Sequence, residues 1–460
     1  MKAISSNLSL RLAHQDFDAI RIGLFTDDGC ENFAVCFCGI AAAKDGLRLL
    51  VRESWIAPTE AYEERSAHHL RIAPRFFNSV VGHGLATHLS PLLVHSHPNA
   101  PKARYSPSDD FGETRLLEVL QQLLPSQRPA SILFSADEVT GRRLIDGVFQ
   151  PLERIDVTGT RHISFRRDEA VQPARDREFF DRQVRIFGDR GQTVIAGLRI
   201  AVVGVGGTGS AVAEQIARLG VDDILLVDPD ALERSNLSRM WGTRDTDLQG
   251  HTLKVDAIAR HLQSIWPKAN VRRIAKSVIR QPVLKALTDR DMVFACTDND
   301  LSRAILNRFA HQYLIPVVDM GIRLDARAGQ VSAAAGRVTI AGTGFACLRC
   351  SNHLDAERVR VESLPLAERT ALDAEGYIQG LNDPAPAVIS LNTTVASLAV
   401  TAGIGSFVNL VGTPPAVDQI YDATSGSIFT VKTAHEPSCE VCSEKGLKGL
   451  GDLKAVSAYE

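Results

Sequence analysis

Long apolar runs and a marked excess of one charge are both missing from this sequence of 460 residues. No apolar run follows a basic N-terminal start, as a secretory signal would require. The longest apolar stretches, residues 200–206 and 395–404, are much shorter than the roughly 20 residues that cross a bilayer. The formal net charge of −3 provides no bulk attraction for nucleic acid or an anionic membrane. We therefore expect a cytoplasmic protein whose partners include neither a membrane nor a nucleic acid.

Cysteine is also sparse, and its eight residues are of two kinds. Four lie singly in apolar segments, namely Cys30, Cys36, Cys38 and Cys296. The other four form two Cys-x-x-Cys pairs, Cys347 with Cys350 and Cys439 with Cys442. In a chain without an export signal, this pattern favours one metal site plus reduced core thiols over a disulfide framework.

The length predicts two domains, because 460 residues exceed what one hydrophobic core usually organises. In residues 1–165, strand-like runs are mixed with a helical pattern. The strands are expected at residues 33–40, 48–51, 91–94 and 130–134, and the helix at 109–124. Residues 166–178 are rich in charge and poor in large apolar side chains, so we interpret them as a linker.

Repeated strand and helix patterns begin at Arg199. They fall at residues 200–203, 210–219, 224–227 and 253–265. Such alternation is typical of an open parallel sheet covered by helices. The predicted fold class is α/β, with an α+β domain followed by a Rossmann-like, doubly wound domain over residues 179–460.

His95 and His97 are two residues apart on an expected strand, so both imidazoles face the same side and can bind one zinc ion. Asp109, at the start of the expected helix, is placed to add an oxygen ligand. Three protein ligands leave a fourth position for a water molecule, as in catalytic zinc sites. A hydroxyl from Ser106 could donate to the oxyanion of a tetrahedral intermediate. The alternative is that the two histidines are unrelated strand residues and that Ser108 only caps the helix.

The His-x-His-Pro and Ser-x-x-Asp segments together resemble the JAB/JAMM metalloprotease signature over roughly residues 15–150. The resemblance implies a JAB/MPN-type domain that cuts peptide or isopeptide bonds after the C-terminal glycine of ubiquitin-like proteins. It also implies a glutamate as general base, and Glu31, ahead of the strand that ends at Gly39, matches that position.

A glycine-rich segment, Gly204-Val-Gly206-Gly207-Thr-Gly209, connects a buried strand to a helix. Glycines there permit a tight turn and close approach of the backbone to phosphate at the helix N-terminus. Asp228, at the end of the next strand, could accept hydrogen bonds from a ribose. These features alone fit a nicotinamide dehydrogenase equally well.

The residues that follow favour adenylation over hydride transfer, because cations and a magnesium-binding carboxylate stabilise charge at a phosphate. In chain order they are Asp228, Asn236, Arg239, Lys254 and Asp298. They resemble the signature of the ThiF/MoeB and ubiquitin-activating enzyme family. The resemblance implies ATP and Mg²⁺ as cofactors, with Asp228 on the ribose. It assigns Asn236, Arg239 and Lys254 to the phosphates and Asp298 to Mg²⁺.

The same resemblance extends upstream to Arg182 and Gln183. It implies that Arg182 reaches the nucleotide site of a second subunit, and hence a homodimer. Phe179 stands where the family often has a second arginine.

The two Cys-x-x-Cys pairs predict a structural zinc site, because four thiolates leave no open position on the ion. Ubiquitin-activating enzymes carry a further cysteine in the crossing loop, but no cysteine lies between Cys350 and Cys439. We expect Cys296 to be a core thiol. Three routes therefore stay open for the adenylated carboxylate: direct transfer to a cysteine of a partner protein, sulfur transfer, or formation of an oxyester on Ser363 or Thr370.

The sequence thus predicts a bifunctional enzyme of a bacterial ubiquitin-like modification pathway. Its partners would be a ubiquitin-like protein and a ubiquitin-conjugating-enzyme-like protein. Processing and activation of a sulfur carrier is the alternative enzyme function. A non-enzymatic scaffold would predict neither ATP turnover nor zinc at the histidines.

Overall fold

The computed structural model describes residues 7–44, 46–166, 176–327, 330–342, 344–375, 386–408 and 417–456. The chain divides into two compact units, each described by itself below. Unit 1 comprises Met1–Ala170, Gln312–Leu314 and Leu447–Ala455, and unit 2 comprises the remaining residues. Among the helices of the described ranges, none combines the length and hydropathy that a membrane crossing requires.

Unit 1 is built on a nine-stranded mixed sheet with the order β11-β10-β1-β3-β2-β6-β7-β8-β9. Its strands are β1 (Leu8–Ala13), β2 (Phe33–Ala43), β3 (Gly46–Ile56), β6 (Ser90–His97), β7 (Ala130–Ser135), β8 (Val139–Ile145), β9 (Val148–Pro151), β10 (Arg154–Thr158) and β11 (Ile163–Arg166). The helices are α1 (His14–Leu24), α2 (Pro74–Thr87), α3 (Pro107–Leu123) and the short 3₁₀ turn η1 (Thr59–Ala61). Strands β4 (Tyr62–Arg65) and β5 (Leu70–Ile72) form a separate two-stranded sheet.

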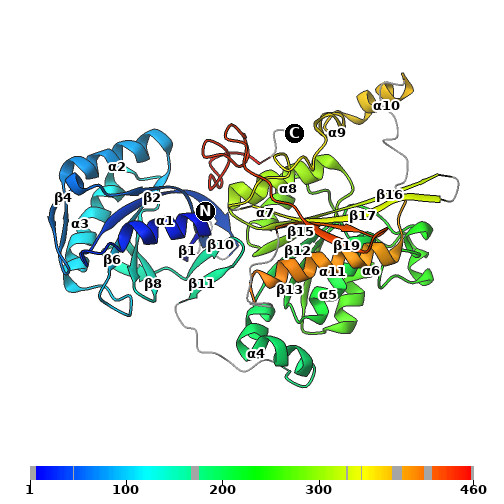
Figure 1. The fold of residues 1–460 in the computed structure, drawn as a ribbon, viewed down its shortest axis with the longest axis horizontal. Coiled ribbons are helices and arrows are strands. Elements are labelled where there is room, and N and C mark those ends of the chain that lie inside the picture. The colour runs from blue at the N-terminus through cyan, green and yellow to red at the C-terminus, as the bar shows by residue number, and fades with distance from the viewer. Residues whose placement is uncertain are drawn as a thin grey trace. The chain divides into compact units, whose positions relative to one another are not determined.

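Alternation along the strands gives this sheet two apolar faces. On β2, Ala34, Cys36 and Cys38 face the cluster that includes Phe17 and Ile20 of α1. The intervening residues of β2, Phe33, Val35 and Phe37, belong to the cluster with residues of α2 and α3. The sheet is therefore covered by α1 on one face and by α2 and α3 on the other (Figure 1).

The segment Leu447–Ala455 packs on β2 and β3, far from it in sequence. The amide of Asp452 donates to the carbonyl of Ile40 (2.8 Å), and the Asp452 carboxylate accepts from the amide of Ala42 (2.8 Å). Lys448 pairs with the Asp16 carboxylate at 2.6 Å. Gly39 leaves room for this segment, because a Cβ there would lie 2.2 Å from the carbonyl oxygen of Gly449.

Unit 2 contains an eight-stranded sheet with the order β14-β13-β12-β15-β16-β17-β18-β19. Its strands are β12 (Arg199–Val203), β13 (Asp223–Val227), β14 (Asn270–Ile274), β15 (Met292–Ala295), β16 (Val317–Arg327), β17 (Gln330–Ala341), β18 (Asp418–Asp422) and β19 (Ser427–Thr430). Its helices are α4 (Asp181–Ala196), α5 (Gly207–Arg218), α6 (Lys254–Ile265), α7 (Gln281–Leu287), α8 (Asp300–Tyr313), α9 (Ala356–Glu362), α10 (Leu366–Ala374) and α11 (Ile389–Gly405). Two 3₁₀ turns are η2 (Arg234–Asn236) and η3 (Asp245–Leu248).

The first four pairings in this order are parallel, and the last three are antiparallel. Helices α5, α6 and α11 share one large apolar cluster with the sheet, and α7 and α8 lie on its opposite side (Figure 1). The chain runs outward from β12 through β13 to β14, then returns to place β15 on the other side of β12. In open α/β sheets, ligands bind beyond the carboxyl ends of the strands at such a switch point. The observed unit is the doubly wound α/β fold that the strand and helix patterns predicted.

Candidate functional site

Strand β6 presents two histidines to the N-terminus of helix α3. His95 Nε2 lies 3.4 Å from one carboxylate oxygen of Asp109, and His97 Nε2 lies 3.3 Å from the other. Ligand atoms of all three side chains lie within 4.8 Å of one another. The structure therefore brings together the three side chains that the sequence suggested as metal ligands.

A capping box at the start of α3 fixes Asp109. Ser106 is the N-cap, and its hydroxyl accepts from the amide of Asp109 (3.2 Å) and donates to the Asp109 carboxylate (2.8 Å). The amide of Ser106 donates to the same carboxylate at 2.6 Å. The reciprocal bonds satisfy amides that the first helical turn would leave unpaired. Ser106 thus holds in position the carboxylate that lies beside the two histidines.

Glu31 lies at the edge of this group, just before β2. Its carboxylate is 3.5 Å from His97 Nε2, and only 7% of the residue is exposed. Burial raises the pKa of Glu31, while the nearby His97 and His95 oppose the rise. A buried carboxylate of raised pKa beside possible metal ligands is suited to accepting a proton.

Charge around the two histidines is set by Asp109. Burial alone would raise the pKa of Asp109, but the adjacent imidazoles of His95 and His97 outweigh burial and hold that pKa well below its usual range. Hydrogen bonding to Asp109 in turn raises the pKa of His97. The carboxylate is thereby kept ionised, which is the form that binds metal.

The donor atoms fit a tetrahedral zinc ion. Two ligands about 2.1 Å from such an ion are about 3.4 Å apart, close to the separations between each histidine and Asp109. His95 Nε2 is buried and has no hydrogen-bond partner among the described residues. A bound cation would satisfy a buried ring nitrogen that faces a carboxylate and a second imidazole.

Sequence reasoning missed one neighbour of this group, Glu113. It is 6% exposed, and its carboxylate lies 3.4 Å from His95 Nδ1, on the side of the ring away from Asp109. The signal was available, because Glu113 follows Asp109 by four residues and so lies on the same face of the helix.

In unit 2, the glycine-rich segment forms the turn from β12 into α5. A Cβ at Gly209 would lie 1.8 Å from the carbonyl oxygen of Gly204, and one at Gly204 would meet the carbonyl oxygen of Cys296 at 2.6 Å. These glycines are required by close backbone packing. Gly206, the N-cap of α5, has nothing within 4 Å of the position of a Cβ, so space is open at the helix N-terminus. Gly207 lies against the side-chain amide of Asn392.

Asp228 follows β13, next to this turn. It is 5% exposed and accepts hydrogen bonds from the amides of Val205 (2.8 Å) and Asp230 (2.9 Å). Burial raises the pKa of Asp228, and these backbone bonds oppose the rise. The hydrogen bond to Val205 ties the carboxylate to the glycine-rich turn.

The other residues expected around a nucleotide vary in exposure. Asn236 is buried and its side-chain oxygen accepts from the amide of Glu233 (3.0 Å). Lys254 starts α6 and pairs with Asp230 at 2.7 Å. Arg239 is half-buried, and its carbonyl oxygen lies 3.3 Å from the position of a Cβ at Gly207.

Asp298 is exposed and follows β15, at the same sheet edge as the glycine-rich turn after β12. Arg182 is different, since its side chain is 92% exposed and lies 3.9 Å from the carboxylate of its neighbour Asp181.

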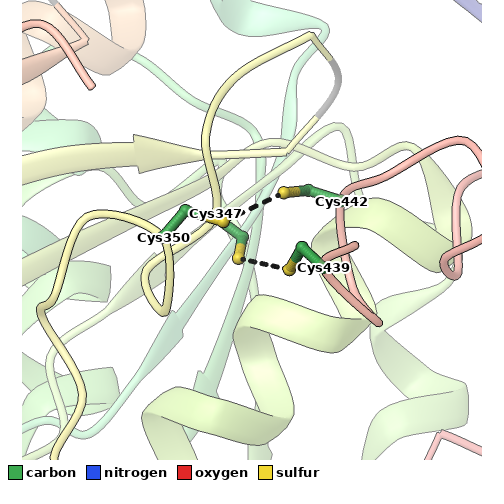
Figure 2. Close-up of side chains that lie close together, drawn as sticks. All are labelled: Cys347, Cys350, Cys439 and Cys442. Carbon is green, nitrogen blue, oxygen red and sulfur yellow. Dashed lines mark hydrogen bonds between the residues drawn. The ribbon is translucent and has the colours of Figure 1, made fainter. Parts of the chain in front are cut away.

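The four paired cysteines converge in unit 2, as Figure 2 shows. The sulfur atoms of Cys347 and Cys439 are 3.6 Å apart, and those of Cys350 and Cys442 are 3.5 Å apart. Thiolates about 2.3 Å from a tetrahedral zinc ion are about 3.8 Å apart, so the four sulfur atoms fit such a site. Cys347 and Cys439 are buried, and this favours a structural ion over a reactive thiol pair.

The residues considered for acyl transfer are placed as follows. Ser363 donates to the carbonyl of Arg360 (2.6 Å), and Thr370 donates to the carbonyl of Leu366 (2.9 Å). Burial raises the pKa of the Cys296 thiol well above its usual value. The stretch 376–385, part of the expected crossing loop, lies outside the described residues.

Sequence comparison with known proteins identifies relatives of this chain. The chain is 26% identical over 274 residues to a protein named SAMP-activating enzyme E1 from Haloferax volcanii, which covers 59% of this chain and 90% of that protein. It is 27% identical over 270 residues to the molybdopterin-synthase adenylyltransferase of Escherichia coli, covering 58% of this chain and 96% of that protein. An adenylyltransferase and sulfurtransferase of Emericella nidulans, uba4, is 28% identical over 276 residues, covering 59% of this chain and 53% of that protein. The model of the ThiF family matches residues 180–441, more than half of the chain, and the protein therefore belongs to the ThiF family.

Proposed function

We propose that unit 2 uses ATP to adenylate the C-terminal carboxylate of a ubiquitin-like or sulfur-carrier protein. The observation that carries this proposal is the glycine-rich turn at the switch point of the sheet, with open space at Gly206 and membership of the ThiF family. In this reaction, a carboxylate oxygen attacks the α-phosphorus of ATP and pyrophosphate leaves. The helix N-terminus at Gly206 offers backbone amides to the phosphates.

The proposal assigns a role to each polar residue near this edge of the sheet. Asp228 accepts from the ribose hydroxyls, and Asn236, Arg239 and Lys254 contact the phosphates. Asp298 holds Mg²⁺, which would neutralise charge on the phosphates when bound. Lys254 would leave its ion pair with Asp230 to do so, an exchange that costs little because the side chain of Asp230 is 61% exposed.

Arg182 is assigned to the nucleotide site of a second copy of the chain. Its high exposure in the single chain leaves the guanidinium free to reach another subunit. The proposal therefore includes a homodimer through unit 2. An Arg182→Ala variant should keep ATP binding in part but lose turnover, and sedimentation will establish whether the parent is a dimer.

Two substrates are compatible with the relatives, since a relative from Drosophila willistoni is named ubiquitin-like modifier-activating enzyme 5 and the Escherichia coli relative is named for molybdopterin synthase. We propose that the substrate is a ubiquitin-like modifier and that a ubiquitin-conjugating-enzyme-like partner accepts it. Activation of a sulfur carrier for sulfur transfer is the second candidate function. ATP–pyrophosphate exchange with candidate carriers, parent against Asp298→Ala, tests adenylation itself. Mass spectrometry of the carrier separates the two outcomes, because a thiocarboxylate forms only in sulfur transfer.

We further propose that unit 1 is a zinc-dependent peptidase that cleaves after the C-terminus of a ubiquitin-like protein. The observation that favours it is the convergence of His95, His97 and Asp109, in which the buried Nε2 of His95 has no hydrogen-bond partner among the residues that the structure describes. Zinc would supply hydroxide at neutral pH by lowering the pKa of its bound water. Glu31 would take up the proton of the attacking water and deliver it to the leaving amine. The hydroxyl of Ser106, which donates to the Asp109 carboxylate in this structure, would rotate to donate to the oxyanion.

The test of this activity is cleavage of a ubiquitin-like protein fused to a C-terminal extension. The parent should release the extension, and His97→Ala and Glu31→Gln variants should not. A His69→Ala variant is the matched control, because His69 is exposed in the turn between β4 and β5 and its imidazole forms an ion pair with Glu64 at 3.1 Å. Both variants should fold. Loss of one equivalent of zinc in His97→Ala but not in Glu31→Gln would show that His97 binds the metal and that Glu31 acts in the chemical step.

A further inference from the structure

A compact group of polar and aromatic side chains lies behind His95, on the side of its ring away from Asp109. Glu113 is at the centre of this group. One of its carboxylate oxygens accepts hydrogen bonds from the hydroxyl of Ser131 (2.7 Å) and from Nε of Arg142 (2.8 Å). The other oxygen, Oε1, lies 3.4 Å from His95 Nδ1 and has no hydrogen-bond partner among the described residues.

Arg142 is itself held in place on several sides. Its guanidinium carbon lies 3.5 Å from the ring centroid of Tyr105 and 3.7 Å from that of Phe149. It also pairs with Asp110. A guanidinium placed between two aromatic rings loses little additional entropy when it binds a carboxylate, so Glu113 is fixed in one orientation.

An ion pair with Arg142 alone does not explain the orientation of Glu113. Both residues are buried, and a bidentate pair would use both carboxylate oxygens on the guanidinium. Here one oxygen takes both donors and the other is directed at the imidazole of His95. A buried carboxylate oxygen is costly without a donor, and Nδ1–H of His95 is the donor within reach.

We propose that Glu113 is a positioning residue that sets the tautomer of His95. By accepting a hydrogen bond from Nδ1–H, it leaves the lone pair on Nε2, the nitrogen that faces Asp109 and His97. This inference rests on the proposed zinc site of unit 1 and adds a residue that acts on the ion only through His95. Metal-binding histidines commonly have such a partner, and its loss weakens metal binding about 10- to 100-fold.

A Glu113→Gln variant of the full chain is a sharp test, because the surrounding donors dictate how the amide must lie. Ser131 and Arg142 both donate to one position, so the amide oxygen takes it. The amide NH₂ then faces Nδ1, which becomes an acceptor and carries no proton. The proton moves to Nε2, where it competes with the metal.

Zinc affinity is measured by competition with a graded series of chelators. We expect Glu113→Gln to bind zinc at the histidine site about 10- to 100-fold more weakly than the parent. Glu118→Gln is the matched control, since Glu118 is exposed on the same helix, and it should match the parent. Zinc at the four cysteines should be unchanged in both variants and provides an internal reference.

The tautomer of His95 is a second readout that a purely structural role would not affect. Nitrogen-15 spectra of histidine-labelled, metal-free protein should show a proton on Nδ1 of His95 in the parent and none on that nitrogen in Glu113→Gln. A variant with parental zinc affinity and parental tautomer overturns the inference. If the parent and His97→Ala hold the same amount of zinc, the zinc site itself is wrong, and the two failures are therefore distinct.

Discussion

The open space at Gly206 leads to a prediction that separates nucleotide binding from folding. Gly206 has φ −73°, a value that any residue adopts, and no atom lies within 4 Å of the position of its Cβ. Gly206→Ala should therefore fold. Gly209→Ala should not fold normally, because its Cβ would lie 1.8 Å from the carbonyl oxygen of Gly204.

The size of each effect follows from these contacts. Alanine at Gly206 lowers the entropy of the unfolded chain, worth about 0.4–1 kcal/mol, and is a poorer N-cap by a similar amount, so the net change in stability is close to zero. The added methyl group occupies the space where phosphate would approach the backbone. Losing one or two charge-assisted hydrogen bonds costs about 3 kcal/mol, and ATP affinity should fall more than about 100-fold.

ATP binding is measured by calorimetry and folding by thermal unfolding, with Gly82→Ala as the control. Gly82 is an exposed position in helix α2, with nothing within 4 Å of its Cβ. We expect Gly206→Ala to unfold near the temperature of the parent and to show no ATP binding at concentrations that saturate the parent. Parental ATP affinity in a folded Gly206→Ala protein would refute the placement of phosphate at this helix N-terminus.

Three further predictions concern stability and metal content. In Gly39→Ala the added methyl group would overlap the carbonyl oxygen of Gly449 and should release the segment Leu447–Ala455 from unit 1. The loss of about four hydrogen bonds should lower the free energy of unfolding by up to about 4 kcal/mol. Hydrogen exchange at β2 and β3 should rise, and the effect should vanish in a chain already lacking that segment. Cys439→Ser should lose one zinc equivalent and melt at a lower temperature by calorimetry, whereas Cys30→Ser should retain its zinc. Asp319 is fully buried, and although burial raises its pKa, the arginines that donate to it hold that pKa below its usual value. The stabilisation that ionised Asp319 gives the folded protein is therefore present above about pH 4 and is lost as the pH falls through the pKa of Asp319 in the folded state. Asp319→Asn should lower the free energy of unfolding at pH 7, measured with urea, by about 3–5 kcal/mol.

Local patterns predicted the parts of the structure that depend on neighbours in sequence. The expected strand 91–94 lies within β6, and the expected helix 210–219 overlaps α5 closely. His95 and His97 share a face because side chains alternate along a strand. Asp109 is fixed by the capping box with Ser106, which precedes it by three residues. Short-range geometry was sufficient for these features.

Features that depend on residues distant in sequence were not predicted. Glu113 gains its role from Ser131 and Arg142, which neighbouring strands bring to it. The docking of Leu447–Ala455 in unit 1 also had no local signal, because Gly39 looks like any strand glycine until Gly449 is placed beside it. Long-range contacts of this kind arise from tertiary packing and leave little trace in a single sequence.

The place of Leu447–Ala455 in unit 1 has a consequence for synthesis of the chain. About 280 residues separate it from Ala170. At about 5 to 20 residues per second, a ribosome needs on the order of 15 to 60 s to cover that distance. Throughout this interval β2 and β3 are without the segment that covers Gly39, and the first unit to emerge is therefore completed only after Leu447–Ala455 has been synthesised. A chain that is truncated late, or stalled on the ribosome, would carry an unfinished first unit, and full translation would then be the condition for its native stability.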